Sequence, residues 1–179
     1  MKILKNDLKS ELNIRTELNF PIEGIEFIDI NPMLIDKDVY NKVIEKFIEE
    51  AQDKNIDYII SPEARGFLFG CPVASKLNIG FIPVRKKGKM PPTTVEIGFE
   101  YEKEYGKDIL ELPKLINNES YKDKNFYIID DIYATGNTAR AIKETVQNLG
   151  GNVLGTGVVI NIKELNNDKV FSLIDINEE

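Results

Sequence analysis

Histidine is absent from this chain of 179 residues, and cysteine occurs only once, as Cys71. Without an imidazole the protein has no histidine metal site, no Ser-His-Asp catalysis and no histidine acid–base chemistry. A single cysteine excludes a disulfide within the chain and suits the reducing cytoplasm. Because Cys71 lies in the apolar stretch 67–74, we expect it to be a buried structural thiol and not a nucleophile.

Long apolar runs are also absent. No stretch approaches the ~20 apolar residues that a membrane-spanning helix needs. Residues 1–17 are polar and mixed in charge, unlike a signal peptide, and we expect them to form a helix that packs on the domain or on a partner. The chain has 23 basic and 30 acidic side chains, a net charge of −7. This balance argues against general binding to nucleic acid or to an anionic membrane.

The spacing of apolar residues predicts one α/β domain over residues 1–179, long enough to bury a substantial core. It indicates strands at 25–30, 58–60, 81–84, 126–130 and 153–160, and helices at 38–52, after Gly66 and at 138–149. Such alternation favours a mostly parallel sheet, whose ligands bind beyond the carboxyl ends of the strands. Residues 88–105 form a long connection suited to a binding loop, with a possible hairpin between 95–101 and 108–112.

The most informative segment is 126–139. An apolar run leads to two consecutive carboxylates, Asp130 and Asp131, and a turn of small and hydroxyl-bearing residues then opens an amphipathic helix. Free backbone N–H groups and the dipole at a helix N-terminus form an anion site. Carboxylates do not bind phosphate, so we expect them to face sugar hydroxyls or a metal. The combination predicts a site for a phosphorylated sugar.

Three segments carry a resemblance to a known family. Asp130-Asp131 followed by Ala134-Thr135-Gly136-Asn137-Thr138 resembles the phosphoribosyl-pyrophosphate (PRPP) motif of the type I phosphoribosyltransferases. Two further segments are similar to the branch of that family that acts on adenine: 63–67 with 84–91, and 104–111. The resemblance extends from about residue 20 to about residue 162. It implies a mostly parallel twisted sheet flanked by helices, a small N-terminal hood at 1–35 and a flexible catalytic loop at 88–105.

The resemblance implies how PRPP is held. Asp130 and Asp131 accept hydrogen bonds from the ribose 2′ and 3′ hydroxyls and lie near the positive charge that develops at C1′. The 5′-phosphate is bound by backbone N–H groups and two hydroxyls of the segment Ala134, Thr135, Gly136, Asn137 and Thr138. Gly136 permits the close approach. Asn137 replaces the glycine that is usual there, and since Asn tolerates left-handed geometry, we expect the loop to keep its shape.

The pyrophosphate is assigned to a second loop by the same resemblance. Backbone N–H groups of Glu63 and Ala64 and the side chain of Arg65 meet the diphosphate, and the family often has a non-proline cis peptide that here falls between Glu63 and Ala64. The only dense basic cluster, Arg85, Lys86, Lys87 and Lys89, is either a solvated surface turn or, through Arg85, Lys86 and Lys89, the rest of an electrostatic clamp. Mg²⁺ is expected to bridge pyrophosphate and ribose oxygens, with no protein side chain as a direct ligand.

The base site is implied for Phe27, Ile28 and Ile160. In similar enzymes the segment that matches Glu26-Phe27-Ile28 recognises adenine through main-chain groups, and the residue that matches Ile160 packs on the ring. Ile28 stands where the family commonly has a basic residue. Ordinary packing in the core is the alternative interpretation for all three.

The resemblance makes the long connection a lid over bound PRPP. Tyr105 would shield the site, and Glu104 is a candidate to handle the N9 proton of the base. Exposed loop polarity is the alternative interpretation for both. The implied catalytic residues are Glu104, Arg65, Asp130 and Asp131.

The expected reaction is adenine + PRPP → AMP + pyrophosphate, a Mg²⁺-dependent step of purine salvage, in a cytoplasmic homodimer. Two alternatives stay open. One is an enzyme for hypoxanthine, guanine or xanthine. Activity with different bases distinguishes it from an adenine enzyme, because inverting one hydrogen bond in a buried base site changes selectivity by ~10²-fold or more. The other is a PRPP-sensing regulatory domain that has lost catalysis.

Overall fold

The computed structural model describes residues 11–20, 23–24, 26–103 and 106–176. Its strands are β1 (Arg15–Leu18), β2 (Glu26–Asp29), β3 (Tyr58–Pro62), β4 (Gly80–Lys86), β5 (Val95–Lys103), β6 (Gly106–Pro113), β7 (Asn125–Tyr133), β8 (Asn152–Ile162) and β9 (Phe171–Ile176). Its α-helices are α2 (Asn31–Ile35), α3 (Lys37–Ala51), α4 (Phe67–Leu77) and α5 (Asn137–Asn148). Short 3-10 turns are η1 (Pro92–Thr94), η2 (Ile116–Asn118) and η3 (Lys163–Leu165).

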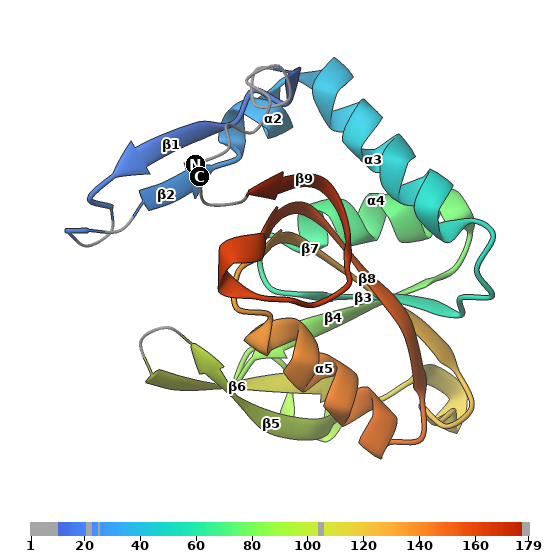
Figure 1. The fold of residues 1–179 in the computed structure, drawn as a ribbon. Coiled ribbons are helices and arrows are strands. Elements are labelled where there is room, and N and C mark those ends of the chain that lie inside the picture. Colours follow the sequence, from blue (N-terminus) through green and yellow to red (C-terminus); the bar gives the residue numbers. More distant parts are fainter. Residues whose placement is uncertain (1–10, 21–22, 25, 104–105, 177–179) are drawn as a thin grey trace.

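Seven of these strands form one sheet in the order β5-β6-β4-β3-β7-β8-β9, while β1 and β2 pair separately (Figure 1). Strands β4, β3, β7, β8 and β9 run parallel to one another, whereas β6 is antiparallel to β4 and β5 is antiparallel to β6. The mostly parallel sheet expected from the sequence is thus observed. The small N-terminal sheet with α2 stands beside it, in the region expected to form the hood.

Helices cover both faces of the main sheet. Helices α3 and α4 lie on one face and α5 on the other (Figure 1). The helix α3 begins where the Asp36 side chain accepts the backbone N–H groups of Asp38 and Val39, an N-cap that satisfies two of the otherwise open donors. Its buried residues recur at helical spacing, and those of α5 include Ala139, Ile142 and Val146, as their spacing predicted.

Each face has its own hydrophobic core. One includes Phe47, Phe69 and Tyr127, beneath α3 and α4. The other includes Phe126, Ile142 and Val146, beneath α5. Because α4 follows β3 and α5 follows β7, the chain leaves these two neighbouring strands toward opposite faces. A sheet of this kind binds ligands at such a switch point.

Four sequence expectations need correction. Within residues 1–17, Arg15–Glu17 belong to strand β1 and not to a helix, because their main chain pairs with β2; residues 1–10 lie outside the described residues. Strand β7 continues through Asp130 and Asp131 to Tyr133. The connection 88–105 is largely strand β5, paired with β6 from Val95 to Lys103 as the expected hairpin.

The fourth correction concerns the cysteine. Cys71 is exposed, because the apolar run 67–74 is the start of helix α4 and only one side of a helix faces the sheet. The buried side chains there are Phe69, Gly70, Val73 and Ala74.

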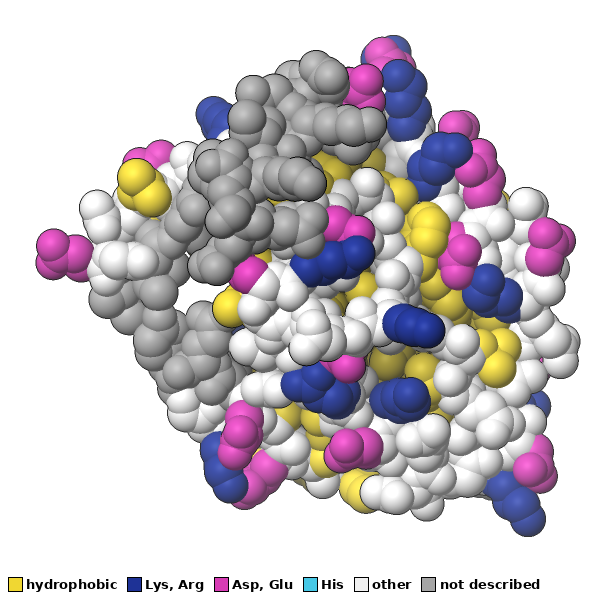
Figure 2. Space-filling view, viewed as in Figure 1, with side chains coloured by type: hydrophobic (Ala, Val, Ile, Leu, Met, Phe, Trp, Pro, Cys, Tyr) yellow, Lys and Arg dark blue, Asp and Glu magenta, His cyan; other side chains and the backbone are white. Residues whose placement is uncertain are grey.

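None of the described helices is long and apolar enough to cross a membrane. On the face seen in Figure 2, Lys and Arg side chains are interspersed with Asp and Glu, without a broad basic surface.

Candidate functional site

Two cavities open where the carboxyl ends of β3 and β7 lie side by side. The first, of about 300 Å³, is lined by the segment Tyr133–Ala139 together with Glu102, Asp130 and Ile132. The second, of about 360 Å³, is lined by Pro62–Arg65, Lys86, Tyr101, Leu110, Asp130–Ile132 and Thr138. Both cavities include Asp130, Ile132 and Thr138, so they form one continuous site with Asp130 at its centre.

The two carboxylates differ in their surroundings. Asp131 is only 3% exposed, and its Oδ2 lies 2.9 Å from Nε of Arg65. That contact lacks hydrogen-bond geometry, so Oδ2 is a buried oxygen without a hydrogen-bond donor among the described residues. Buried polar atoms are nearly always hydrogen-bonded in proteins. The residue lines the second cavity, and Oδ2 itself is enclosed beside the Arg65 guanidinium.

Asp130 lines both cavities, and its Oδ1 accepts the backbone N–H of Asp131 at 2.9 Å. Burial, and then the negative charge of Asp131, raise the pKa of Asp130 well above its ordinary value, although the Asp131 N–H and Arg65 act in the opposite direction. Perturbed carboxyl groups in a cleft are typical of functional sites.

This raised pKa gives a testable effect on stability. A carboxyl that holds its proton more tightly in the folded than in the unfolded chain stabilises the fold fully below the ordinary pKa, near 3.8, and that contribution is lost as pH rises through the window up to the raised value. We therefore expect Asp130→Asn, which stays neutral, to raise Tm at neutral pH. Each kcal/mol is about 2–4 °C in a chain of this size.

The measurement is thermal unfolding of wild type and Asp130→Asn at about pH 7.5 and about pH 4. The gain in Tm should shrink toward zero at the lower pH. A gain that is equal at both values, or a loss at neutral pH, would contradict the charge strain assigned to Asp130.

The first cavity ends at the N-terminus of α5. Gly136 has φ +79°, and α5 begins at Asn137 without a side-chain cap. The N–H groups of the first helical turn have no partner within the helix and, with the dipole, favour an anion. The left-handed residue is Gly136 and not Asn137. Asn137 is tolerated because it occupies the first helical position, which corrects the reason expected from the sequence.

The second cavity combines a loop and basic side chains. The peptide bond between Glu63 and Ala64 is cis, as the family resemblance implied, and Glu63, Ala64 and Arg65 line the cavity with Lys86. Arg85 is paired instead with Glu63, its Nε 2.7 Å from Oε2. Lys89 is exposed in the following turn and is not among the residues that line the two cavities.

Glu63 shapes this loop. Burial raises the pKa of Glu63, but hydrogen bonds from Arg85 and from the backbone N–H of Lys86 outweigh burial and hold that pKa below its usual value. Glu63 stays ionised as an anchor between the end of β3 and the end of β4. The guanidinium of Arg85 also lies over the ring of Phe67, with Cζ 5.8 Å from the ring centroid, and this contact helps to hold the arginine side chain in place.

The three residues expected at the base site lie in different surroundings. Phe27 approaches the site, since its ring lies 5.8 Å from the guanidinium of Arg65 and packs edge-on against Phe20. Ile28 and Ile160 are 9% and 1% exposed and share one hydrophobic core. Both side chains are packed in the core, as the alternative interpretation expected, and their contact with a base stays a prediction. Glu104 and Tyr105 lie outside the described residues.

Sequence reasoning missed a group of residues behind the first cavity. Arg140 donates to the carbonyl oxygen of Thr135 and to Oδ1 of Asn137, and it pairs with Asp168. Asn166 donates to the carbonyl oxygen of Ala134. Arg140 is close to the motif in sequence, but nothing in the sequence pattern links it to residues 166 and 168.

A ready-made metal site is not part of the described residues, which contain no cluster of three or more acidic or cysteine side chains placed for an ion. A divalent cation at this site would have to take most of its ligands from a bound molecule and from water.

Comparisons with known proteins identify the family. The phosphoribosyl transferase domain family matches residues 33–178 of the chain. The adenine phosphoribosyltransferase of Clostridium acetobutylicum is 47% identical over 160 residues, which cover 89% of each chain. This protein belongs to the phosphoribosyltransferase family.

Solved structures of other phosphoribosyltransferases share its fold. The adenine phosphoribosyltransferase of Thermoanaerobacter pseudethanolicus is 38% identical, with a TM-score of 0.82, over 95% of this chain and 98% of that one. The enzyme of Saccharomyces cerevisiae, in complex with D-2,5-dideoxy-2,5-imino-altritol 1,6-bisphosphate and adenine, is 39% identical, with a TM-score of 0.80, over 94% and 99%. The type I phosphoribosyltransferase fold expected from the sequence is confirmed.

Proposed function

We propose that this phosphoribosyltransferase transfers the 5-phosphoribosyl group of PRPP to adenine, giving AMP and pyrophosphate, in purine salvage. One observation carries the proposal: two cavities meet at Asp130, one ending at an uncapped helix N-terminus and the other lined by Arg65 and Lys86. PRPP has the same layout, a ribose with a phosphate at one end and a diphosphate at the other. The relatives named above, as adenine enzymes, support the base.

We assign each part of PRPP to a group of the described residues. The 5′-phosphate takes the N–H groups of Ala134–Thr138 with the hydroxyls of Thr135 and Thr138, and the ribose hydroxyls donate to the carboxylates of Asp130 and Asp131. The pyrophosphate lies along Glu63–Arg65 and Lys86, with Arg85 and Lys89 as more distant positive charges. Holding both ends of PRPP fixes C1′ between them, and positioning of this kind lowers a barrier by several kcal/mol.

The chemistry then depends mainly on electrostatics. As pyrophosphate leaves, negative charge grows where Arg65 and Lys86 lie, and positive charge grows at C1′ near Asp130 and Asp131. Preorganised charges in a site with little water stabilise such a separation. We assign to Tyr105 the shielding of this step from water and to Glu104 the N9 proton of the base.

Mg²⁺ fits the donor set. The carboxylates of Asp130 and Asp131 belong to residues that line the second cavity, and Mg²⁺ usually keeps several waters and takes its other ligands from phosphates. These two carboxylates would meet the water shell of the ion while PRPP supplies the direct ligands. A bound Mg²⁺ would supply positive charge that helps the diphosphate to leave.

We also propose that the protein is a cytoplasmic homodimer built from one domain per chain. The single cysteine supports the compartment. Large apolar side chains exposed on α2 and α4, Ile35 at 82% and Leu68 at 41%, support association with a second copy.

The proposal is tested by incubating the purified protein with adenine, PRPP and Mg²⁺ and separating the products by chromatography. AMP and pyrophosphate should form in equal amounts, and EDTA should reduce the rate to background, with recovery when Mg²⁺ is restored in excess. Binding of PRPP without any AMP would favour the sensing alternative. A rate that EDTA does not change would contradict the role of the cation.

A further inference from the structure

The first cavity has a supporting network on its outer side, formed by the connection between β8 and β9. Two carbonyl oxygens of the loop 134–138 accept hydrogen bonds from outside the loop. The carbonyl oxygen of Ala134 accepts Nδ2 of Asn166, in the β8–β9 connection, at 2.7 Å, and that of Thr135 accepts Nη2 of Arg140, on α5, at 2.6 Å. Asn166 is itself placed by bonds to Asn161 Oδ1 and to the carbonyl oxygen of Ile162, each of 3.0 Å.

Peptide planarity links these bonds to the ligand side of the loop. In a trans peptide the C=O of one residue and the N–H of the next point in opposite directions. Holding Ala134 O therefore sets the direction of the Thr135 N–H, and holding Thr135 O sets that of the Gly136 N–H. Both of these residues line the first cavity.

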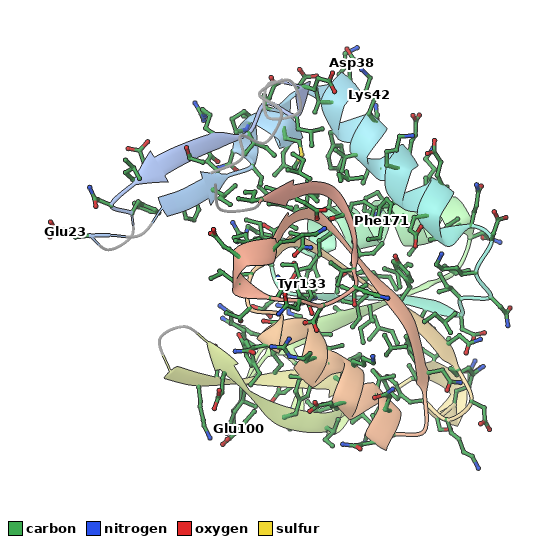
Figure 3. The ribbon with its side chains drawn as sticks, viewed as in Figure 1. Glu23, Asp38, Lys42, Glu100, Tyr133 and Phe171 are labelled. Carbon is green, nitrogen blue, oxygen red and sulfur yellow. The ribbon has the colours of Figure 1, made fainter. Side chains whose placement is uncertain are left out.

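The network has one acidic anchor, Asp168. Its Oδ2 accepts Nη1 of Arg140 and, at 2.7 Å, the hydroxyl of Tyr133, while its backbone N–H donates to Oδ1 of Asn166 at 3.2 Å. Figure 3 shows Tyr133 between the start of α5 and the β8–β9 connection. Arg140 also donates to Oδ1 of Asn137 at 2.8 Å, so the amide at this position takes part in the same network.

We propose that Arg140, Asp168 and Asn166 are positioning residues that hold the loop 134–138 with its N–H groups toward the 5′-phosphate. The inference rests on the proposed function, because it takes the anion at this loop to be the 5′-phosphate of a ribosyl ligand. None of the three is among the residues that line the first cavity, so they act through the loop.

A second explanation for Arg140 is long-range attraction between its positive charge and the phosphate. The pairing with Asp168 argues against it, since the two opposite charges largely cancel at a distance. The two explanations also differ in what removal of Asp168 does. Removing a negative charge near a phosphate strengthens its attraction, whereas removing an anchor of the loop weakens binding.

The test is the Kd of ribose 5-phosphate, measured by calorimetry without adenine, for wild type, Arg140→Ala and Asp168→Ala. Each variant should bind ribose 5-phosphate about tenfold more weakly, because it loses about one charge-assisted hydrogen bond that holds the loop in its binding conformation. Lys46→Ala, which removes a cation from an exposed pair with Glu49 on α3, is the matched control and should bind as wild type does.

Pyrophosphate binding to the same variants separates positioning from general damage. The Kd of pyrophosphate should stay within about twofold of wild type, because the loop Glu63–Arg65 is held by the bonds of Glu63 to Arg85 and to the Lys86 N–H. Arg140→Lys should restore part of the affinity for ribose 5-phosphate. Weaker binding in Arg140→Ala with tighter binding in Asp168→Ala would overturn the proposal in favour of simple attraction. Equal losses for both ligands would overturn it in favour of a purely structural role.

The outcome is independent of the base. If wild type binds ribose 5-phosphate but makes no AMP, the proposed function fails, and weaker binding of ribose 5-phosphate by both variants still supports the positioning role. If AMP forms but both variants bind ribose 5-phosphate normally, the positioning role alone is wrong. If wild type does not bind ribose 5-phosphate, the assignment of this loop to a phosphate is wrong.

Discussion

Replacement of Asp131 by Asn is expected to lower kcat/KM for PRPP by about 10²–10³-fold, the usual effect of losing one preorganised electrostatic contact at a reacting centre. Asp131 is 3% exposed, and its Oδ2 has no hydrogen-bond donor among the described residues. The amide removes the charge that we propose faces C1′, and it leaves Arg65, whose Nε lies 2.9 Å from Oδ2, without its partner. Steady-state kinetics should show a higher KM for PRPP together with a lower kcat.

The control for this substitution is Asp53→Asn, which removes one carboxylate from an exposed turn after α3. It should leave both kinetic constants unchanged. Thermal unfolding of Asp131→Asn will show that the variant is folded at the assay temperature. If a folded Asp131→Asn keeps kcat/KM within twofold of wild type, the ribose site has been placed on the wrong carboxylate.

The second large effect is expected for Gly136→Ala, which should weaken ribose 5-phosphate binding by about 10²-fold or more. Gly136 has φ +79°, and a Cβ there would lie 2.5 Å from the hydroxyl oxygen of Tyr133, far inside van der Waals contact. The loop or the tyrosine must move, and a shift of about 1 Å in a positioning element costs on the order of 10²-fold. The measurement is calorimetric titration with ribose 5-phosphate.

Gly24→Ala provides a matched control, because Gly24 has a similar φ of +88° but nothing within 4 Å of the added Cβ. Both substitutions carry the same left-handed strain of about 1–2 kcal/mol, so both should lower Tm by a few degrees. Only Gly136→Ala should lose ligand affinity. Equal affinities in the two variants would show that close approach at Gly136 is not what shapes the phosphate site.

The local parts of the site could be predicted from the sequence. Asp130, Asp131 and the loop 134–138 are consecutive, and a strand followed by a turn and a helix places them at one edge of a parallel sheet. Glu63–Arg65 follows a neighbouring strand, so the same rule brings it to the same edge. Their placement at one edge needed only the order of elements, whereas the assignment of Glu63–Arg65 to the pyrophosphate came from the family resemblance.

Contacts between distant segments could not be predicted in this way. Arg140 and Asp168 are 28 residues apart, and their pairing depends on how the β8–β9 connection folds back over α5. Likewise, a hydrophobic stretch does not reveal which side of its helix faces the sheet, which is why Cys71 was wrongly expected to be buried. Residues 15–18 became a strand through pairing with β2, a tertiary effect that overrides a weak local pattern.

The most direct test of the central claim is pyrophosphate release from PRPP and Mg²⁺, measured in parallel with adenine, hypoxanthine, guanine and xanthine. We predict release with adenine, and a kcat/KM for each oxopurine that is lower by about 10²-fold or more, because a donor and an acceptor at position 6 are exchanged. Equal or faster release with an oxopurine would contradict the assignment to adenine. Absence of release with all four bases from a protein that binds PRPP would contradict catalysis itself.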